Sequence, residues 1–366
     1  MNAVNTNYDL TLEIKSPVFI GTSQEKNWVR NIDFIHYKGK VFILNQHRLF
    51  TDMDDQQREK YTSLIAKNRY RDLERFLTND FDLEDYADHI FDYDGKLNGN
   101  EIKPLIRGGN GQTYIPGSSI KGAISSSLFG YLYHATHQRG VSDDLSKQLL
   151  GSFDKALGRF IRPFDTTENT LESEISDVNL FNLRQQYGNW EADFKENFRI
   201  LLESFKPKTK TKFRLSLADG LGTFLQKRGR NLLPKNYHRI FTDQPLETLF
   251  RIINDQTKKH LAKEIAFFET YDQDEDVPTI IDQLAFLQDL VETPNACLLR
   301  MSGGSGFHGI TGDWRFSDHL QTIDQPDKKN MIYDFKTRQR KPARYKSRRV
   351  AYPWTELMGF VQLSRA

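Results

Sequence analysis

Residues 113–133, TYIPGSSIKGAISSSLFGYLY, constrain the fold of this chain more than any other stretch. Two strand-prone residues, Tyr114 and Ile115, precede a Pro-Gly break. Four apolar residues then recur at every fourth position: Ile120, Ile124, Leu128 and Leu132. This period places them on one face of a helix, and Ser118 or Ser119 is of the residue type that caps a helix N-terminus. The stretch therefore predicts a strand, a turn and a capped amphipathic helix.

The N-terminus of such a helix is suited to a phosphate group. Its first N–H groups lack partners within the helix and its dipole end is positive. The candidate phosphate-binding residues are Gly117, Ser118, Ser119 and Lys121. A P-loop is excluded, because Lys121 precedes Gly122 and Ala123 follows it, whereas that motif requires Gly-Lys-Ser/Thr. A capped helix that only packs on a sheet remains the alternative.

Composition limits the function classes open to the chain. Its 366 residues lead us to expect two domains. The net charge is only +2, so any basic footprint for nucleic acid must be local. The single cysteine, Cys297, excludes an internal disulfide and a cysteine-rich zinc site, and we expect it in the core. No apolar run is long enough to span a membrane and no signal-peptide core begins the chain, which predicts a cytoplasmic protein.

The first hundred residues predict strands followed by helices. Residues 8–14 alternate in strand fashion, and the apolar runs 31–35 and 41–44 are joined by a short glycine-containing link typical of a hairpin. Residues 46–90 are polar and lack Pro, which indicates short helices. The acidic run 80–101 is interpreted as a solvated insert, because its carboxylates do not match the spacing of a calcium loop.

Further elements follow from the same patterns. Strands are expected at 160–164 and 176–182, and helices at 190–205, 244–269 and 279–291. Four lysines occupy alternate positions: Lys206, Lys208, Lys210 and Lys212. In an extended chain they share one face, where they either protect an edge strand or follow a phosphate backbone. The sequence does not decide between these two interpretations.

Two stretches near the C-terminus are suited to nucleic acid. An apolar strand at 296–301 leads into a glycine-rich loop, but neither a helix nor a βαβ unit follows, which excludes a dinucleotide site. The loop residues able to approach a phosphodiester are Gly303, Gly304, Ser305 and Gly306. Residues 336–349 carry eight cations and no acid, with Tyr345 among them, which favours nucleic acid over a solvated basic face. Candidate residues there are Lys336, Arg338 and Arg340.

The octet IPGSSIKG at residues 115–122 resembles the signature of the RAMP superfamily, the RNA-binding subunits of CRISPR effector complexes. The segment SPVFIG at 16–21 and the glycine-rich loop have similar counterparts in that family. The ending, with KTR at 336–338 and PWT at 353–355, is most similar to RAMP proteins at the guide-RNA 3′ end of type III-A (Csm) complexes.

The resemblance implies an α+β fold built from RRM-like (ferredoxin-like) domains with helical inserts. The expected domains are 1–205, with an insert at about 51–100, and 206–366, with an insert at about 231–295. It also implies a non-catalytic subunit that grips the guide RNA backbone and caps the backbone filament in antiviral defence. The implied partners are guide RNA and other RAMP subunits, above all the repeated backbone subunit, with no cofactor, metal or membrane.

Four residues are candidates for a catalytic role. Asp33 lies about as far from the N-terminus as the catalytic Asp of the related repeated subunit, but inside the apolar run NIDFI, so we interpret it as an ordinary strand residue. His36, His47 and His308 are candidates for metal-free RNA cleavage, and His308 is the best placed, although it has no visible acid–base partner. The alternatives are therefore a RAMP endoribonuclease that processes guide RNA with His308 as general base, and a stand-alone RNA-binding module.

Overall fold

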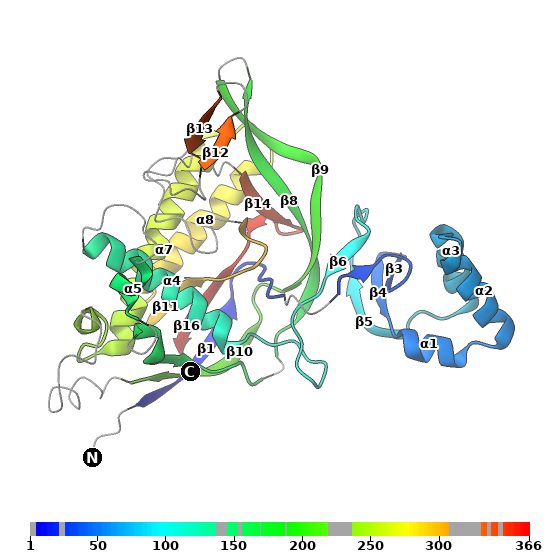
Figure 1. Ribbon diagram of the computed structural model, residues 1–366, viewed down its shortest axis with the longest axis horizontal. Coiled ribbons are helices and arrows are strands. Elements are labelled where there is room, and N and C mark those ends of the chain that lie inside the picture. The colour runs from blue at the N-terminus through cyan, green and yellow to red at the C-terminus, as the bar shows by residue number, and fades with distance from the viewer. Residues whose placement is uncertain are drawn as a thin grey trace.

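A computed structural model gives the structure of the chain (Figure 1). It describes residues 5–21, 26–136, 145–152, 156–168, 170–186, 189–218, 236–306, 331–334, 338–342 and 347–366. No helix within these ranges is long and apolar enough to cross a membrane. Helices and several sheets alternate along the chain, which confirms the α+β class.

An antiparallel five-stranded sheet carries the main core, with the strand order β11-β16-β1-β10-β7. Its strands are β1 (Thr6–Ile14), β7 (Ile161–Pro163), β10 (Lys210–Leu217), β11 (Ala296–Arg300) and β16 (Phe360–Arg365). The first and last strands of the chain are therefore neighbours, which brings both ends of the sequence into one sheet (Figure 1). The expected alternation of β1 is confirmed, since Leu10, Leu12 and Ile14 are fully buried. Cys297 in β11 is also fully buried, as expected.

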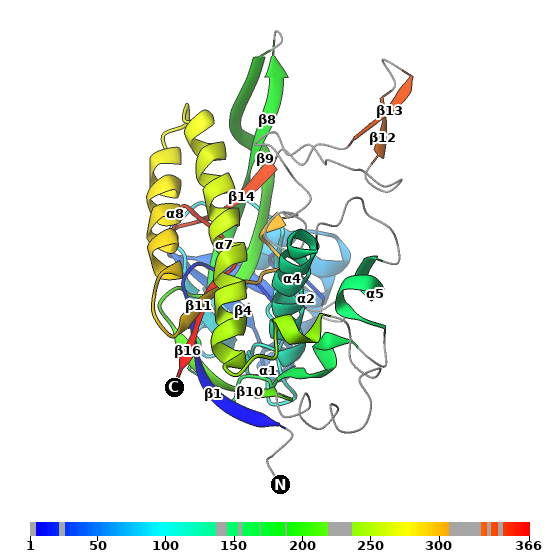
Figure 2. The same ribbon diagram turned by 90° about the vertical axis from the view of Figure 1, so that its left-hand side faces the viewer.

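Helices α4 (Gly117–Ala135) and α7 (Pro245–Thr270) contribute to the same core. The predicted apolar row of α4 is confirmed, because Ile120, Ile124, Leu128 and Leu132 are buried with the inward side chains of β1. Helix α8 (Val277–Val291) lies beside α7 (Figure 2), and both match the predicted helices. The remaining helical pieces here are α5 (Leu145–Leu150), η1 (Leu157–Arg159) and η3 (Tyr237–Arg239).

A six-stranded sheet, in the order β15-β14-β8-β9-β6-β2, contains a long hairpin that projects from the body (Figure 1). Its strands are β2 (Trp28–Val29), β6 (Glu101–Lys103), β8 (Ser173–Gln186), β9 (Asn189–Phe205), β14 (Ser347–Tyr352) and β15 (Glu356–Leu357). The helix predicted at 190–205 is wrong, because this segment is strand β9. Pairing with β8 across the hairpin satisfies its backbone, and this pairing overrides the helix-forming residues of the segment.

A small lobe stands to one side of the body (Figure 1). It consists of β3 (Phe34–Tyr37), β4 (Lys40–Leu44), α1 (Gln46–Asp52), α2 (Asp55–Ala66), α3 (Tyr70–Asp80) and β5 (Ala87–Asp92). The predicted hairpin and the short helices up to residue 80 are confirmed, and residues 87–92 form a strand instead of a helix. A separate pair of strands, β12 (Met331–Asp334) and β13 (Gln339–Pro342), lies in the basic segment. The division of the chain at residue 205 stays a prediction.

Candidate nucleic-acid interface

The octet at 115–122 forms the start of α4, although two details differ from the prediction. Residues 114–116 are irregular, so no strand precedes the helix. The helix begins at Gly117 with Pro116 as its N-cap residue, so the predicted serine cap is wrong. The cause is Asp165, whose Oδ1 accepts the Gly117 N–H at 2.7 Å. A carboxylate from a distant segment thus does what a serine cap would do.

The two glycines of the octet have different roles. A Cβ on Gly117 would lie 2.3 Å from the backbone oxygen of Pro163, so glycine is required there for packing. Gly122 is exposed and has nothing within 4 Å of its Cβ position. Ser118 is exposed, while Ser119 and Lys121 are partly buried. The open surface of this helix start therefore consists of the two serines, Lys121 and Gly122.

The glycine-rich loop follows β11 and packs against residues 17–21. The Gly303 N–H donates to the backbone oxygen of Phe19 at 2.8 Å, and the Phe19 N–H donates to the Ser302 hydroxyl at 3.1 Å. A Cβ on Gly303 would lie 3.2 Å from the Phe19 ring, and one on Gly304 would lie 2.6 Å from a methyl carbon of Leu202. Packing alone therefore explains these two glycines.

The last two described residues of the same loop lie beside β14. Ser305 and Gly306 are partly buried, and Gly306 has a φ of +80°, a conformation that favours glycine. The nearest side chain to its Cβ position is Arg349, at 3.8 Å. The loop thus offers Ser305 and Gly306 to a ligand, next to Arg349 of β14, while Gly303 and Gly304 hold the loop in place.

The last two arginines of the basic segment, Arg348 and Arg349, lie on opposite faces of strand β14. Arg348 points inward, with its side chain 3% exposed, and forms an ion pair with Glu264, which is 2% exposed. Its guanidinium also lies 3.8 Å from the centroid of the Phe267 ring. Arg349, the next residue, lies on the opposite face because side chains alternate along a strand. Burial lowers the pKa of Arg349, and it forms no ion pair within the described part of the chain.

Sequence reasoning did not single out Arg349, although it lies in the basic segment. Among the residues that were singled out there, Lys336 lies outside the described residues, as does His308. Arg338 is exposed between β12 and β13, and Arg340 lies in β13, opposite Tyr333. Only the position of β14 in the sheet distinguishes Arg349 from Arg348.

The helix start and the glycine-rich loop contact one core. Ile120 of α4 and Met301, just before the loop, belong to the same buried cluster, together with Ile20. The Ile106 N–H donates to the Ile20 backbone oxygen at 2.8 Å, which ties the lead-in of α4 to the segment that carries Phe19. The structure thus anchors the two predicted RNA-contacting segments on one hydrophobic core.

The lysine row does not form part of this surface. Strand β10 lies between β1 and β7 in the sheet, but β7 pairs only with residues 215–217. Among the described strands, only β1 pairs with the part of β10 that carries Lys210 and Lys212, so the edge-strand interpretation stays a prediction. Lys210 pairs with Glu13 at 3.3 Å and Lys212 with Glu168 at 3.2 Å. Because carboxylates balance these lysines, a phosphate backbone would gain little from them.

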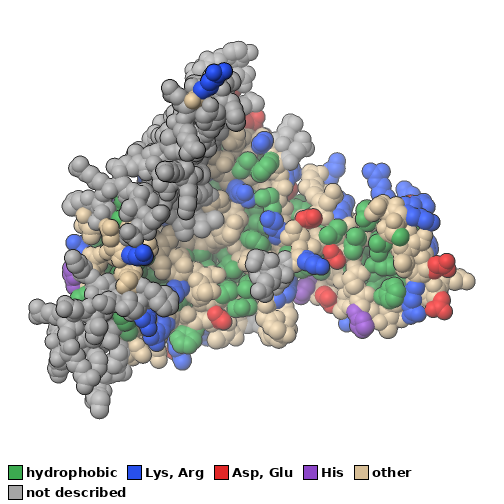
Figure 3. All heavy atoms as spheres, in the orientation of Figure 1, with side chains coloured by type: hydrophobic (Ala, Val, Ile, Leu, Met, Phe, Trp, Pro, Cys, Tyr) green, Lys and Arg blue, Asp and Glu red, His purple; other side chains and the backbone are tan. Residues whose placement is uncertain are grey.

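Basic side chains also gather on the small lobe, over α2 and α3 (Figure 3). Arg69 and Arg75 both lie near Asp72, at 2.7 and 3.9 Å. These pairs are exposed and follow the helical i,i+3 spacing, which is typical of a solvated helix face. We do not assign this patch to RNA.

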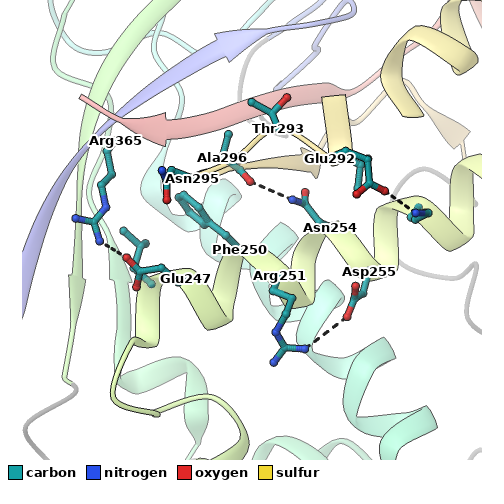
Figure 4. A pocket seen from close by; sticks show the side chains of 13 residues that line it. Glu247, Phe250, Arg251, Asn254, Asp255, Glu292, Thr293, Asn295, Ala296 and Arg365 are labelled. Carbon is teal, nitrogen blue, oxygen red and sulfur yellow. Dashed lines mark hydrogen bonds and ion pairs between the residues drawn. The ribbon is translucent and has the colours of Figure 1, made fainter. Parts of the chain in front are cut away.

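A pocket of about 310 Å³ between α7, the end of α8 and β16 is lined by charges that already have partners (Figure 4). Arg365 pairs with Glu247, and Arg251 approaches Asp255 at 3.7 Å. The Asn254 amide donates to the backbone oxygen of Ala296 at 3.0 Å. A charged ligand would have to break these contacts, so the pocket is not a candidate site.

Three of the four candidate catalytic residues lie in the described part of the chain: Asp33, His36 and His47. Asp33 was expected inside a strand, which is wrong, because it lies in the turn before β3. Its Oδ2 accepts the Val29 N–H at 2.8 Å, and Asn31 adopts a φ of +60°, so the carboxylate stabilises the turn. His36 Nε2 lies 3.0 Å from the backbone oxygen of Tyr93, and His47 is exposed. Within the described ranges, no three His, Cys, Asp or Glu side chains form a metal-binding group.

Known proteins are similar to this chain in sequence and in fold. Residues 11–317 match the family model of the RAMP superfamily. The "CRISPR system Cms protein Csm5" of Methanocaldococcus jannaschii is 30% identical over 136 residues, which span 33% of this chain and only 31% of that protein. The Csm5 of Streptococcus thermophilus is 22% identical over 268 residues, which span 65% of this chain and 72% of that protein.

Two solved structures share the fold over nearly the whole length. One is a chain of a Csm–crRNA–target RNA ternary complex of a type III-A CRISPR-Cas system, with a TM-score of 0.67, 17% identity and coverage of 98% of this chain and 100% of that one. The other is T. onnurineus Csm5, with a TM-score of 0.57, 16% identity and coverage of 96% and 99%. The likeness agrees with the expected RRM-like α+β fold. Because the family model matches most of its length, the chain belongs to the RAMP superfamily.

Proposed function

We propose that this chain is an RNA-binding subunit of a type III-A CRISPR effector complex in the cytoplasm. It grips the backbone of the guide RNA toward its 3′ end and caps the filament of backbone subunits for antiviral defence. Its partners are the guide RNA and neighbouring RAMP subunits, above all the repeated backbone subunit. The likeness in fold to a chain of a Csm–crRNA–target RNA complex supports this assignment.

The observation that carries the proposal is the partial burial of Lys121 and Arg349 without a counter-charge from the described residues. Both cations are partly buried, and neither forms an ion pair within the described part of the chain. Partial burial of a cation without a counter-charge costs free energy, so an anion from outside the chain would stabilise both. Each lies beside a segment with little side-chain bulk, Gly122 in one case and Gly306 in the other, where a phosphodiester can approach the backbone.

The surroundings favour contact with phosphates over contact with bases. Phe19, a partly buried aromatic residue, lies next to the glycine-rich loop, and a Cβ added to Gly303 would lie 3.2 Å from its ring. The groups proposed to contact RNA are an ammonium, a hydroxyl and a guanidinium, which bind phosphate oxygens, and phosphate contacts carry no sequence information. Binding through Lys121, Ser305 and Arg349 would therefore depend little on RNA sequence.

The test measures binding of a labelled guide RNA to Lys121→Ala, Arg349→Ala and the double variant over a range of salt concentrations. Each substitution should weaken binding, and the slope of log K against log salt should fall by up to about one per cation removed. The matched control is Lys210→Ala with Lys212→Ala, which removes two lysines that are paired with carboxylates. Wild-type affinity and slope in the double variant would refute the proposed interface.

We also propose a role for the basic segment through Lys336, Arg338 and Arg340. Alanine at all three positions should weaken RNA binding to a similar degree for unrelated RNA sequences, because phosphate contacts carry no sequence information. The same salt titration applies. An unchanged slope would mean that this segment is only a solvated basic face.

The subunit does no chemistry in this proposal. Its support is the position of Asp33, whose carboxylate is held by a backbone N–H in a turn, and of His36, whose ring contacts a backbone oxygen. Neither has an acid–base partner of the kind that metal-free cleavage requires among the contacts of the described residues. Co-purification of the chain with the other subunits and with guide RNA separates this proposal from a stand-alone RNA-binding module.

A further inference from the structure

A pocket of about 820 Å³ is lined by described residues other than those assigned to RNA contact. Its walls come from the β8–β9 hairpin, from residues 92–98 after β5, from the start of α8 and from the end of β14. Segments distant in sequence therefore build it together, and no predicted RNA-contacting residue lines it.

Aromatic rings form part of the wall. Tyr93, Phe194 and Tyr352 all line the pocket. The rings of Phe194 and Tyr352 lie 6.1 Å apart at an angle of 65°, and the Tyr352 hydroxyl donates to the Asp276 carboxylate. Tyr352 is therefore held in place, and these rings give a planar ligand group surfaces on which to stack.

One buried acceptor in the pocket is unused. Asp177 is 5% exposed, and its Oδ2 accepts a hydrogen bond from Arg199 at 3.2 Å. Its Oδ1 is buried and has no hydrogen-bond partner among the described residues. Burial raises the pKa of Asp177, while the nearby Arg199 opposes this shift. An unpaired buried carboxylate oxygen costs free energy that a donor from a ligand would recover.

The charged residues that line the pocket indicate whether it favours a cation or an anion. The carboxylates are Asp92, Asp94, Glu174, Asp177 and Asp276, and the cations are Lys96, Lys195 and Arg199. Among the described lining residues, five acids stand against three bases, an excess of two negative charges. A phosphodiester is disfavoured in such a pocket, and a cation is favoured.

We propose that this pocket receives an arginine side chain from a partner protein. A guanidinium is planar and cationic, so it can stack on the aromatic wall while an N–H donates to the free Oδ1 of Asp177. A lysine ammonium lacks the planar face, and a nucleobase would bring its phosphate into an acidic pocket. The volume exceeds that of one side chain, so residues flanking the arginine enter as well.

The decisive test places a photo-reactive p-benzoylphenylalanine at Asn98, an exposed residue of the lining. The variant is assembled into the effector complex from purified subunits and guide RNA, irradiated and digested for mass spectrometry. The cross-link should join the residue placed at position 98 to an arginine-containing peptide of another subunit. Asp177→Asn should lower its yield at least tenfold, and the rim variant Asp92→Asn should lower it less than twofold. Replacing the identified arginine by alanine should also abolish it, and lysine should restore it only in part.

An adduct with RNA, an adduct with a peptide lacking arginine, or no adduct at all would overturn the proposal. A second measurement needs no complex: saturation-transfer NMR of the isolated chain with N-acetylarginine methylamide as probe. Transfer should occur with this probe, be absent with the uncharged citrulline analogue and with AMP, and be lost in Asp177→Asn. Equal transfer from AMP would point to a nucleotide pocket and refute the assignment to a protein.

Discussion

Glu203, a fully buried residue of β9, accepts hydrogen bonds from both terminal nitrogens of Arg107, at 2.7 and 2.8 Å. The Leu105 N–H and the Ser173 hydroxyl donate to the same carboxylate at 2.9 and 3.0 Å. The guanidinium also lies 5.2 Å from the centroid of the Trp28 ring. These contacts tie the chain just before α4 to the β8–β9 hairpin, so they link the candidate RNA-binding helix to the projecting sheet.

Glu203→Gln should therefore destabilise the protein strongly. It leaves the Arg107 guanidinium without its carboxylate in a buried setting, and such changes typically cost about 3 to 5 kcal/mol. Urea denaturation measures the change. The control is Glu172→Gln, whose exposed pair with Lys206 at 3.6 Å should contribute less than about 1 kcal/mol. A loss as small as that of the control would mean that solvent reaches the Arg107 site.

Two glycines should respond to alanine with opposite signs. A Cβ on Gly304 would meet a Leu202 methyl carbon at 2.6 Å and the Met358 sulfur at 3.0 Å, so Gly304→Ala should lower the free energy of unfolding by about 1 to 3 kcal/mol. At Gly122 the space is open and the residue lies in a helix, so Gly122→Ala should raise it by about 0.5 to 1 kcal/mol. Thermal melts of both variants check the pair, and an unaffected Gly304 variant would show that the loop has room.

Stability should fall with rising pH because of Glu356. Burial, followed by the charge of Glu174, raises the pKa of Glu356 to about 7, and its buried Oε2 has no hydrogen-bond partner among the residues that the structure describes. The folded state therefore binds this proton more tightly than the unfolded state. The stabilisation is complete below the unfolded pKa, near 4.5, and is lost as the pH rises through about 7.

The size of this effect is up to about 3 kcal/mol, since each pKa unit corresponds to about 1.4 kcal/mol. Urea denaturation at pH 5 and pH 8 should show a smaller pH dependence in Glu356→Gln than in the wild type. The variant should also be the more stable of the two at pH 8, because glutamine stays neutral. Parallel pH curves for both proteins would show that Glu356 titrates normally.

Asp33→Ala and His308→Ala should leave target cleavage by the reconstituted complex, and guide maturation, within about threefold of wild type. Loss of a true catalytic acid or base typically costs a hundredfold or more. Asp33→Ala should lower stability slightly, because the Val29 N–H loses its acceptor. A hundredfold loss of either activity with assembly intact would instead make the endoribonuclease alternative correct.

Local patterns in the sequence were enough to predict several elements. The four-residue period of Ile120 and its partners, the alternation of Leu10 and Leu12 in β1, and the helices α7 and α8 are all confirmed. Each depends on the order of residues within one segment, because an amphipathic element must turn its apolar side to a core wherever that core lies. The octet and the glycine-rich loop were also recognisable as short local motifs.

Tertiary structure alone decided other features. Residues 190–205 form a strand because β8 supplies their backbone partners, and α4 begins at Gly117 because Asp165 reaches it from another segment. Adjacent arginines, Arg348 and Arg349, differ because β14 turns one toward Glu264 and the other toward the glycine-rich loop. These outcomes depend on contacts with other segments of the chain, and a pattern within one segment contains no information about them.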